Sequence, residues 1–408
     1  MNVLDVLVSC AYFHLVTTPA PARRVKIAVA AAGISSFALL YAPQPVLPQL
    51  AAQYHLDPGG AALAVSVATG ALALAVLPIA ALSEVVGRRP VILTSVIASA
   101  ALGLLLPLMP SYPALLVLRA LQGVAIAGFP GVAAAYLAER LGRTGVAAAV
   151  GAMIAGNTVG GMLGRLASGF TAGPLGWRGA LSVVAAISAL CSLITVLALP
   201  PSGRPQHKAV LAGLVTALQQ PVLLAQYVVA LLAMGSFVAL YNAAGFRLTG
   251  APLSLSPAVA SLVFLAYATG SVSSAAAGRL VARVGRPRAL AGALLLTLMG
   301  AALTLPDSVP LVVAGFVVLT CAFFAAHAVA NGWAAAEAPE TARGQVGGLY
   351  TLSYYLGSSI GGAAGAYVFG HAGWPWLIAV VAAWLLLAAF AVARVTRAEP
   401  AARLAVSR

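Results

Sequence analysis

Charge is what this sequence lacks most, since only 7% of its 408 residues are Asp, Glu, Lys or Arg while 62% are hydrophobic. About a quarter of the residues of an ordinary soluble domain are charged, and such a domain cannot bury this much apolar surface in its own interior. The composition therefore excludes a soluble globule and predicts that lipid covers much of the chain.

Acidic residues are the rarest charged type, with 8 Asp and Glu against 22 Lys and Arg. All of them fall in expected loops, tails or helix ends: Asp5, Asp57, Glu84, Glu139, Asp307, Glu337, Glu340 and Glu399. The central helices contain no carboxylate pair, no Cys and His cluster and no phosphate-binding loop, and the 3 cysteines lack metal-ligand spacing. The sequence thus predicts neither an enzyme nor a cofactor or metal site.

Long apolar runs fill most of the chain. A helix needs about 20 apolar residues to cross the roughly 30 Å hydrocarbon layer of a bilayer. Twelve such helices are expected, near residues 26–47, 61–82, 90–109, 113–137, 145–170, 178–199, 221–245, 257–279, 288–305, 310–334, 345–368 and 374–394. The pattern predicts an all-α membrane protein with 12 transmembrane helices in two pseudo-symmetric six-helix bundles.

Internal repetition divides the chain into two halves. The pair Gly87 and Arg88 recurs 198 residues later as Gly285 and Arg286. A row of glycines also recurs, with Gly156, Gly160 and Gly164 matched by Gly357, Gly361 and Gly365. We expect a tail over 1–25, bundles over 26–199 and 221–394, a linker over 200–220 and a second tail over 395–408. Paired halves are typical of transporters that rock around a central site.

Basic residues mark the orientation in the membrane. If the N-terminus is cytoplasmic, eighteen of the 22 basic residues lie in inside loops and tails, and only Arg178 and Arg247 lie outside. This positive-inside bias predicts that both termini are cytoplasmic, and it accounts for the net charge of +14 without a nucleic-acid partner.

The glycine rows allow close packing of helices, because residues four apart share a helix face and glycine has no side chain. Such a strip can serve static packing or a moving interface, and the sequence leaves both open.

The loop after the second expected helix, from Leu82 to Arg89, resembles the major facilitator superfamily, and the resemblance extends from about Arg24 to Arg397. It implies that Glu84, Gly87, Arg88 and Arg89, with Gly285 and Arg286 in the second half, help to close the cytoplasmic side. In the second half Ala282 stands where an acid is expected, so a weaker ionic latch is expected there.

Two further motifs carry the resemblance. Arg119, Gln122 and Gly123 in the fourth helix look like a motif whose arginine lies in the central cavity and is linked to proton movement. The glycines and Asn157 of the fifth helix are similar to the antiporter motif, although Gly161 replaces its proline and Arg165 its last glycine. The chain thereby resembles bacterial inner-membrane efflux proteins assigned to sugars or drugs.

A solute site is expected at mid-membrane between the halves, lined by the polar and aromatic residues that interrupt apolar helices. The candidates are Tyr41, Gln44, Arg119, Asn157, Tyr241, Asn242, His327, Asn331, Tyr354 and Tyr355, with Gln226, Tyr227, Phe264, Tyr267 and Tyr350 as second choices.

If protons drive transport, the expected proton carrier is His327, working with Arg119, because imidazole titrates near neutral pH and no central carboxylate is present. A neutral, hydrogen-bonded histidine is the structural alternative. The two embedded cations, Arg119 and Arg165, would favour an anionic or strongly polar solute, but for Arg165 we favour snorkelling toward the outer surface.

The sequence therefore predicts a monomeric secondary transporter, most readily a proton-coupled exporter of a drug, sugar or organic metabolite, whose partners are the solute, protons and lipid. A transport-inactive receptor or scaffold of the same fold, or a uniporter or symporter that imports a polar or anionic solute, is the alternative.

Overall fold

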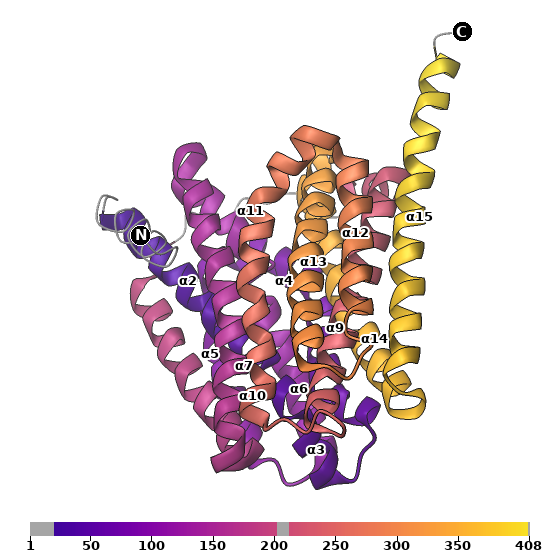
Figure 1. The fold of residues 1–408 in the computed structure, drawn as a ribbon. Helices are drawn as coiled ribbons and strands as arrows, with labels where there is room; N and C mark the ends of the chain where they lie inside the picture. Colours follow the sequence, from indigo (N-terminus) through magenta and orange to yellow (C-terminus); the bar gives the residue numbers. More distant parts are fainter. Residues whose placement is uncertain (1–19, 202–211, 407–408) are drawn as a thin grey trace, which may run out of the picture.

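The computed structural model describes residues 20–201 and 212–406; within these ranges the side chains of 20, 21, 142–144, 147, 212 and 398–406 are left aside. The expected tail up to residue 19, residues 202–211 of the expected linker and residues 407 and 408 lie outside the described part. All regular structure in the described ranges is helical (Figure 1).

The first half consists of α2 (Ala20–Tyr41), η1 (Gln44–Val46), α3 (Leu47–Tyr54), α4 (Pro58–Val86), α5 (Arg88–Leu105), η2 (Leu106–Leu108), α6 (Tyr112–Ala127) and α7 (Ala133–Ala198). The second half consists of α8 (Ala212–Gln219), α9 (Pro221–Thr249), α10 (Pro257–Ser261), η3 (Leu262–Ala266), α11 (Tyr267–Val284), α12 (Arg286–Ala302), α13 (Val309–Glu337), η4 (Glu340–Ala342), α14 (Arg343–Ala372) and α15 (Trp374–Val406).

The 66-residue α7 is a folded-back helix and not a straight rod. Gly156 packs against the backbone of Ala30 in α2, and the hydroxyl of Thr195 donates to the carbonyl of Ala28, two residues from Ala30. In a straight helix, residues 156 and 195 would lie about 58 Å apart, at 1.5 Å per residue. The chain therefore reverses between them, and Gly176 has the positive φ of 63° that such a reversal requires.

The predicted helix over 113–137 is wrong as one continuous element. The chain forms a turn at residues 128–132, between α6 and α7, which contains Pro130. Proline removes a backbone donor and clashes with the preceding turn, so the helix ends before it. The helix resumes at Ala133 and continues the same crossing, since Tyr136 reaches the carbonyl of Pro200 through a hydrogen bond of 2.9 Å.

Eight helical stretches among the described residues are long and apolar enough to cross a membrane, and one of them, Ala148–Ala198, contains two passes. The crossing made by α6 with the start of α7, together with α12 and α14, brings the number of passes within the described ranges to twelve. The predicted count is confirmed. Large apolar side chains such as Leu74, Leu197 and Trp376 are mostly exposed on the outer faces of the helices, where lipid would cover them.

Helix boundaries follow from turn chemistry in the sequence. Asp57 caps α4, because its carboxylate oxygen accepts from the amide of Gly60 at 2.6 Å. Gly87 and Gly285 end α4 and α11 with φ of 97° and 80°, values that a residue with a side chain rarely adopts. The repeated Gly-Arg pair therefore forms the same tight connection in both halves.

Both glycine rows pack within their own half. Gly156, Gly160 and Gly164 bring the backbone of α7 against α2, and Gly357, Gly361 and Gly365 bring α14 against α9 in the same way. The two interfaces are related by the internal repeat.

The halves meet along α4 and α14 and at one end of the molecule. We call the end with the connection between α2 and α4 the Pro43 end, and the end with the connection between α4 and α5 the Gly87 end. The residue pairs from Gly59 and Tyr367 to Leu77 and Gly348 show that α4 and α14 are packed over most of their length. At the Pro43 end α7 also packs on α10, where Gly169 faces Ser261.

Candidate solute site

A break in α2 positions the central polar network. The helix ends at Tyr41, and Pro43 follows in a turn, after which Gln44 begins a short 3-10 helix. The side-chain amide of Gln44 donates to Asn242 in α9 at 2.7 Å, so that this hydrogen bond joins the two halves. Both side chains are buried, and the amide nitrogen of Asn242 has no hydrogen-bond partner.

Arg165 of α7 completes the network. Its Nε donates to the side-chain oxygen of Gln44, and one terminal nitrogen donates to the carbonyl of Gly161 at 2.8 Å. The guanidinium lies over the rings of Tyr41 at 4.1 Å and Tyr267 at 4.5 Å. Each buried cation–π contact contributes roughly 0.5–2 kcal/mol.

The snorkelling predicted for Arg165 is therefore wrong. The residue is only 1% exposed, because it points between the halves and not toward the outer surface. Within the described ranges, no Asp or Glu forms an ion pair with it. A buried guanidinium without a carboxylate partner is costly, so the faces of Tyr41, Phe264 and Tyr267 and the oxygen of Gln44 are its main compensation.

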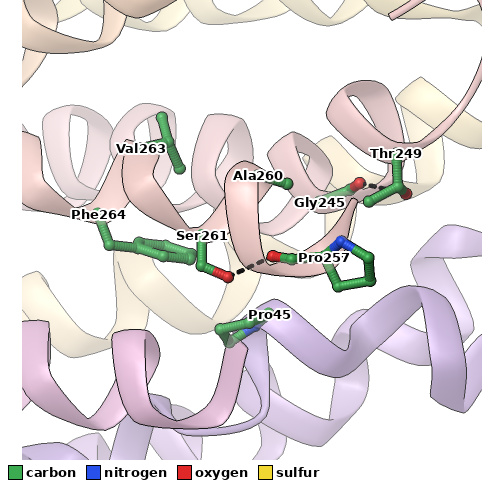
Figure 2. Close-up of a pocket in the computed structure, with 8 residues that line it drawn as sticks. All are labelled: Pro45, Gly245, Thr249, Pro257, Ala260, Ser261, Val263 and Phe264. Carbon is green, nitrogen blue, oxygen red and sulfur yellow. Dashed lines mark hydrogen bonds between the residues drawn. The ribbon is translucent and has the colours of Figure 1, made fainter. Parts of the chain in front are cut away.

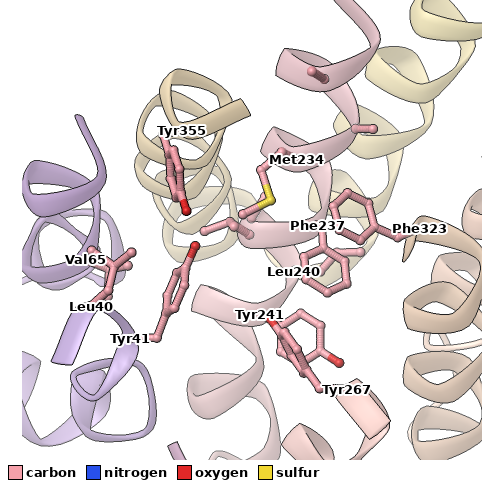
Figure 3. Close-up of a cluster of buried hydrophobic side chains, with 14 of the residues drawn as sticks. Leu40, Tyr41, Val65, Met234, Phe237, Leu240, Tyr241, Tyr267, Phe323 and Tyr355 are labelled. Carbon is pink, nitrogen blue, oxygen red and sulfur yellow. The ribbon is translucent and has the colours of Figure 1, made fainter. Parts of the chain in front are cut away.

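Aromatic side chains continue from this network into the second half. We call the contact region between the two halves the seam. Figure 3 shows Tyr41 and Tyr355 pointing toward each other across it, with Tyr241 and Tyr267 side by side below them. Tyr241 is held by a hydrogen bond of 2.7 Å with Thr320. Tyr354 packs at right angles to Tyr355, with ring centroids 5.2 Å apart.

His327 of α13 lies at the far side of these rings. Its Nδ1 is 3.0 Å from the hydroxyl of Tyr350, and its ring centroid is 4.7 Å from that of Tyr354. The imidazole also stacks near Phe323. The histidine is thus hydrogen-bonded between α13 and α14, and the Tyr350 hydroxyl also lies 3.3 Å from its carbonyl oxygen.

Arg119 lies apart from this cluster, inside the first half. Its donors are taken by the carbonyls of Ala64 at 2.6 Å, Leu39 at 3.0 Å and Leu40 at 2.6 Å, and by Gln122. The carbonyl of Leu39 lacks its usual helical partner because residue 43 is a proline without an N–H. The side chain is fully buried and fixes the broken end of α2.

Asn157 and Asn331 also lie away from the network. Asn157 packs against Gly33 of α2, and its side-chain oxygen is buried without a hydrogen-bond partner. Asn331 of α13 is exposed. The structure thus brings together Tyr41, Gln44, Tyr241, Asn242, Tyr354, Tyr355 and His327, and leaves three of the ten candidate residues outside the cluster.

At the Gly87 end, Arg88 binds Glu84 at 3.1 Å and Glu139 at 3.2 Å, and Arg89 donates to the carbonyl of Leu199. All of these contacts stay in the first half. In the second half Arg286 binds Glu337 at 3.0 Å. Arg88 thus binds two carboxylates and Arg286 binds one, because Ala282 stands at the repeat position of Glu84 while Glu337 stands at that of Glu139.

The seam is closed at the Pro43 end. Figure 2 shows the pocket between Pro45 of the first half and Ser261 and Phe264 of the second, whose volume of about 10 Å³ holds no solute. A larger groove of about 450 Å³ lies between α4 and α14 at the same end, but its walls, including Leu63 and Val368, are almost wholly apolar.

Sequence reasoning left Arg165 out of the site and ranked Phe264, Tyr267 and Tyr350 second. Phe264 and Tyr267 are three residues apart, and residues at this spacing lie on one helix face. That spacing, together with the replacement of a glycine by Arg165 in the fifth helix, could have shown that a cation and two rings share the seam.

A helical protein with twelve membrane passes in two repeated bundles, and a polar network between them, belongs to the class of membrane transporters. Residues 29–251 and 243–407 match the family model described as Major Facilitator Superfamily, and the chain belongs to that family. Its members are transporters of small solutes, not enzymes.

Relatives cover almost the whole chain. It is 34% identical over 371 residues to the uncharacterized MFS-type transporter YybF of Bacillus subtilis, covering 90% of this chain and 92% of that protein. It is 36% identical over 370 residues to the inner membrane transport protein YnfM of Escherichia coli, covering 90% and 88%. The fold matches an inward-facing, unoccupied structure of a bacterial homolog of the human lysosomal transporter Spinster, with a TM-score of 0.77, 17% identity and coverage of 92% and 97%.

Proposed function

We propose that this protein is a secondary active transporter that moves a small solute by alternating access, and that it exports a drug, sugar or organic metabolite in exchange for protons. The observation that carries the proposal is the network of Arg165, Gln44 and Asn242, a polar link between two apolar bundles. Polar groups are costly within the membrane and are concentrated where solutes pass.

The proposed location is a bacterial inner membrane, with both termini in the cytoplasm and the chain acting as a monomer. The excess of basic residues near the Gly87 end supports this orientation, and the name of YnfM supports the location. The Pro43 end then faces the outside. Its packed seam supports an inward-facing state, in which the contact between α7 and α10 closes the outer side.

Within this proposal, Tyr41, Gln44, Tyr241, Asn242 and Tyr355 form the solute site. His327 carries the proton, because imidazole ordinarily titrates near neutral pH and its ring packs on Tyr354 beside this site, and its bond with Tyr350 couples protonation to the position of α14. Arg119 acts at a distance by fixing the broken end of α2, which places Gln44.

The direct test is solute flux in proteoliposomes. Purified protein is reconstituted and given an imposed pH gradient with labelled sugars, organic acids and drugs. We expect gradient-driven movement of at least one class, and loss of most of it in Gln44→Leu, which cuts the link between the halves. Absence of flux for the whole panel under every gradient would support the alternative of a transport-inactive receptor or scaffold.

The coupling role of His327 is tested by His327→Gln, with His371→Gln as the matched control. His371 is an exposed histidine that stacks on Tyr367 at the Pro43 end. We expect His327→Gln to keep solute exchange but to lose its acceleration by a pH gradient, whereas His371→Gln behaves as the native protein. Unchanged coupling in His327→Gln removes the assignment.

A further inference from the structure

In the part of the chain that the structure describes, no acidic side chain pairs with the positive charge buried at the seam. Among the described residues, the membrane interior holds two fully buried guanidinium groups, those of Arg119 and Arg165. Arg119 has its donors taken by three carbonyls and Gln122, so it has little capacity for another anion. Arg165 donates to Gln44 and Gly161 and lies against aromatic rings, including that of Tyr267, and none of these partners is an acidic side chain.

The rings around Arg165 come from both halves. Tyr41 belongs to the first half, whereas Phe264 at 5.4 Å and Tyr267 at 4.5 Å belong to the second. When the Pro43 end opens, Arg165 moves with α7 and loses Phe264 and Tyr267. A buried cation then needs new partners, of which one must supply charge and another a flat apolar face.

A free donor lies in the same network. The amide nitrogen of Asn242 is buried and has no partner, although its side-chain oxygen accepts from Gln44. A carboxylate can accept from a guanidinium and from an amide at once, because its two oxygens offer about four lone pairs. Asn242 thus offers an unpaired donor in the network of Arg165, to which it is linked through Gln44.

We propose that the transported solute is a small organic anion in which a carboxylate is attached to a planar apolar ring, and that Arg165 binds that carboxylate. This inference rests on the proposed transport function. The carboxylate takes the edge of the guanidinium, and the ring of the solute replaces Phe264 and Tyr267 over its face. The site therefore rejects amines, because a second cation beside Arg165 is repelled.

The test uses ligand-dependent thermal unfolding of the full-length protein in detergent, with benzoate as the probe. Benzamide is a neutral ligand of the same shape, and benzylamine carries the opposite charge. We expect millimolar benzoate to raise the melting temperature by about 3–5 °C, with no comparable rise for benzamide or benzylamine.

Three variants locate the binding group. Arg165→Gln should weaken the apparent affinity for benzoate about tenfold or more, and Arg165→Lys should retain part of it. Arg178→Gln is the matched control, because Arg178 also lies over an aromatic ring, that of Trp177 at 4.5 Å, but sits away from the seam. It should respond to benzoate as the native protein does.

Gln44→Glu covers the case in which Arg165→Gln fails to fold. It places a carboxylate where the oxygen of Gln44 already accepts from Arg165, so the fold gains a counterion and the benzoate response should vanish. A benzoate response equal to that of benzamide, or one that survives in Gln44→Glu and Arg165→Gln, overturns the inference. Flux of another solute in that case leaves the transport function intact, whereas absence of any flux rejects the function itself.

Discussion

The two buried arginines show that equal burial can serve different purposes. Arg119 bonds to carbonyls of α2 and α4, including that of Leu39, which Pro43 leaves without its usual helical partner. Arg165 bonds to one side chain and lies on rings from both halves. The first arginine is fixed within a rigid bundle, and the second can change partners when the bundles separate.

Removal of the Arg119 guanidinium should therefore reduce stability. In Arg119→Gln the carbonyls of Leu39, Leu40 and Ala64 lose charged donors, and we expect a loss of roughly 3–5 kcal/mol or failure to accumulate in the membrane. The measurement is thermal unfolding of the purified variant. Val117→Ala, a lipid-facing change in the same helix, is the control and should unfold close to the native temperature.

At the scale of helices, the repeated glycine rows set how closely α7 approaches α2 and how closely α14 approaches α9. Any side chain added there meets the backbone of the facing helix, which cannot move without displacing the whole bundle. The rows are therefore a property of each half and keep each half rigid.

Gly160→Ala should destabilise the protein by about 1–3 kcal/mol, because its Cβ would collide with the backbone of Ile34. Gly151→Ala in the same helix is the control, since a Cβ there has nothing within 4 Å. The melting temperatures of the two variants are compared in one detergent. Equal values would show that α2 and α7 are not tightly packed in solution.

The helices were also the part of the structure that the sequence predicted best. Twelve apolar runs and the positive-φ turns at Gly87 and Gly285 follow from local residue pattern, because membrane length and glycine conformation are local constraints. The break at Pro130 was a local signal that the run of apolar residues obscured.

The contacts of the site were harder to predict, since they depend on which face of a helix points to the seam. Arg119 was expected in the central cavity, but its guanidinium bonds to the carbonyls of Leu39 and Leu40 at the end of α2, where Pro43 leaves that of Leu39 without its helical partner. Arg165 was expected at the outer surface. A rotation of α7 about its axis by part of a turn decides whether the Arg165 side chain points to lipid or to the seam. Such choices are made by packing of the whole bundle and are not encoded in the spacing within one helix.

At the scale of the whole molecule, the proposed alternating access requires the Pro43 end to open and close. We expect Gly169→Cys and Ser261→Cys, which face each other across the seam, to form a disulfide after a slight separation of the helices, since a Cβ at residue 169 would otherwise lie closer to that of Ser261 than the Cβ spacing of a disulfide. Oxidation should stop flux and reduction should restore it. The native cysteines are first replaced by serine. Flux is measured in proteoliposomes before and after oxidation.

A cross-link within one half is the control. The hydroxyl oxygens of Ser35 in α2 and Ser192 in α7 lie 2.9 Å apart. A disulfide between Ser35→Cys and Ser192→Cys therefore links two helices of the same bundle. Flux should continue after its oxidation. If both cross-links stop flux equally, the motion is not a rigid rotation of the halves.

The continuous packing of α4 on α14 has a geometric consequence. Because α4 and α14 stay packed together, alternating access requires the halves to tilt about this contact, so that one end opens while the other closes. Displacement grows with distance from the contact, so α4 and α14 should shift least between states while α7 and α11 travel furthest. A cargo molecule would then enter at one end and leave at the other.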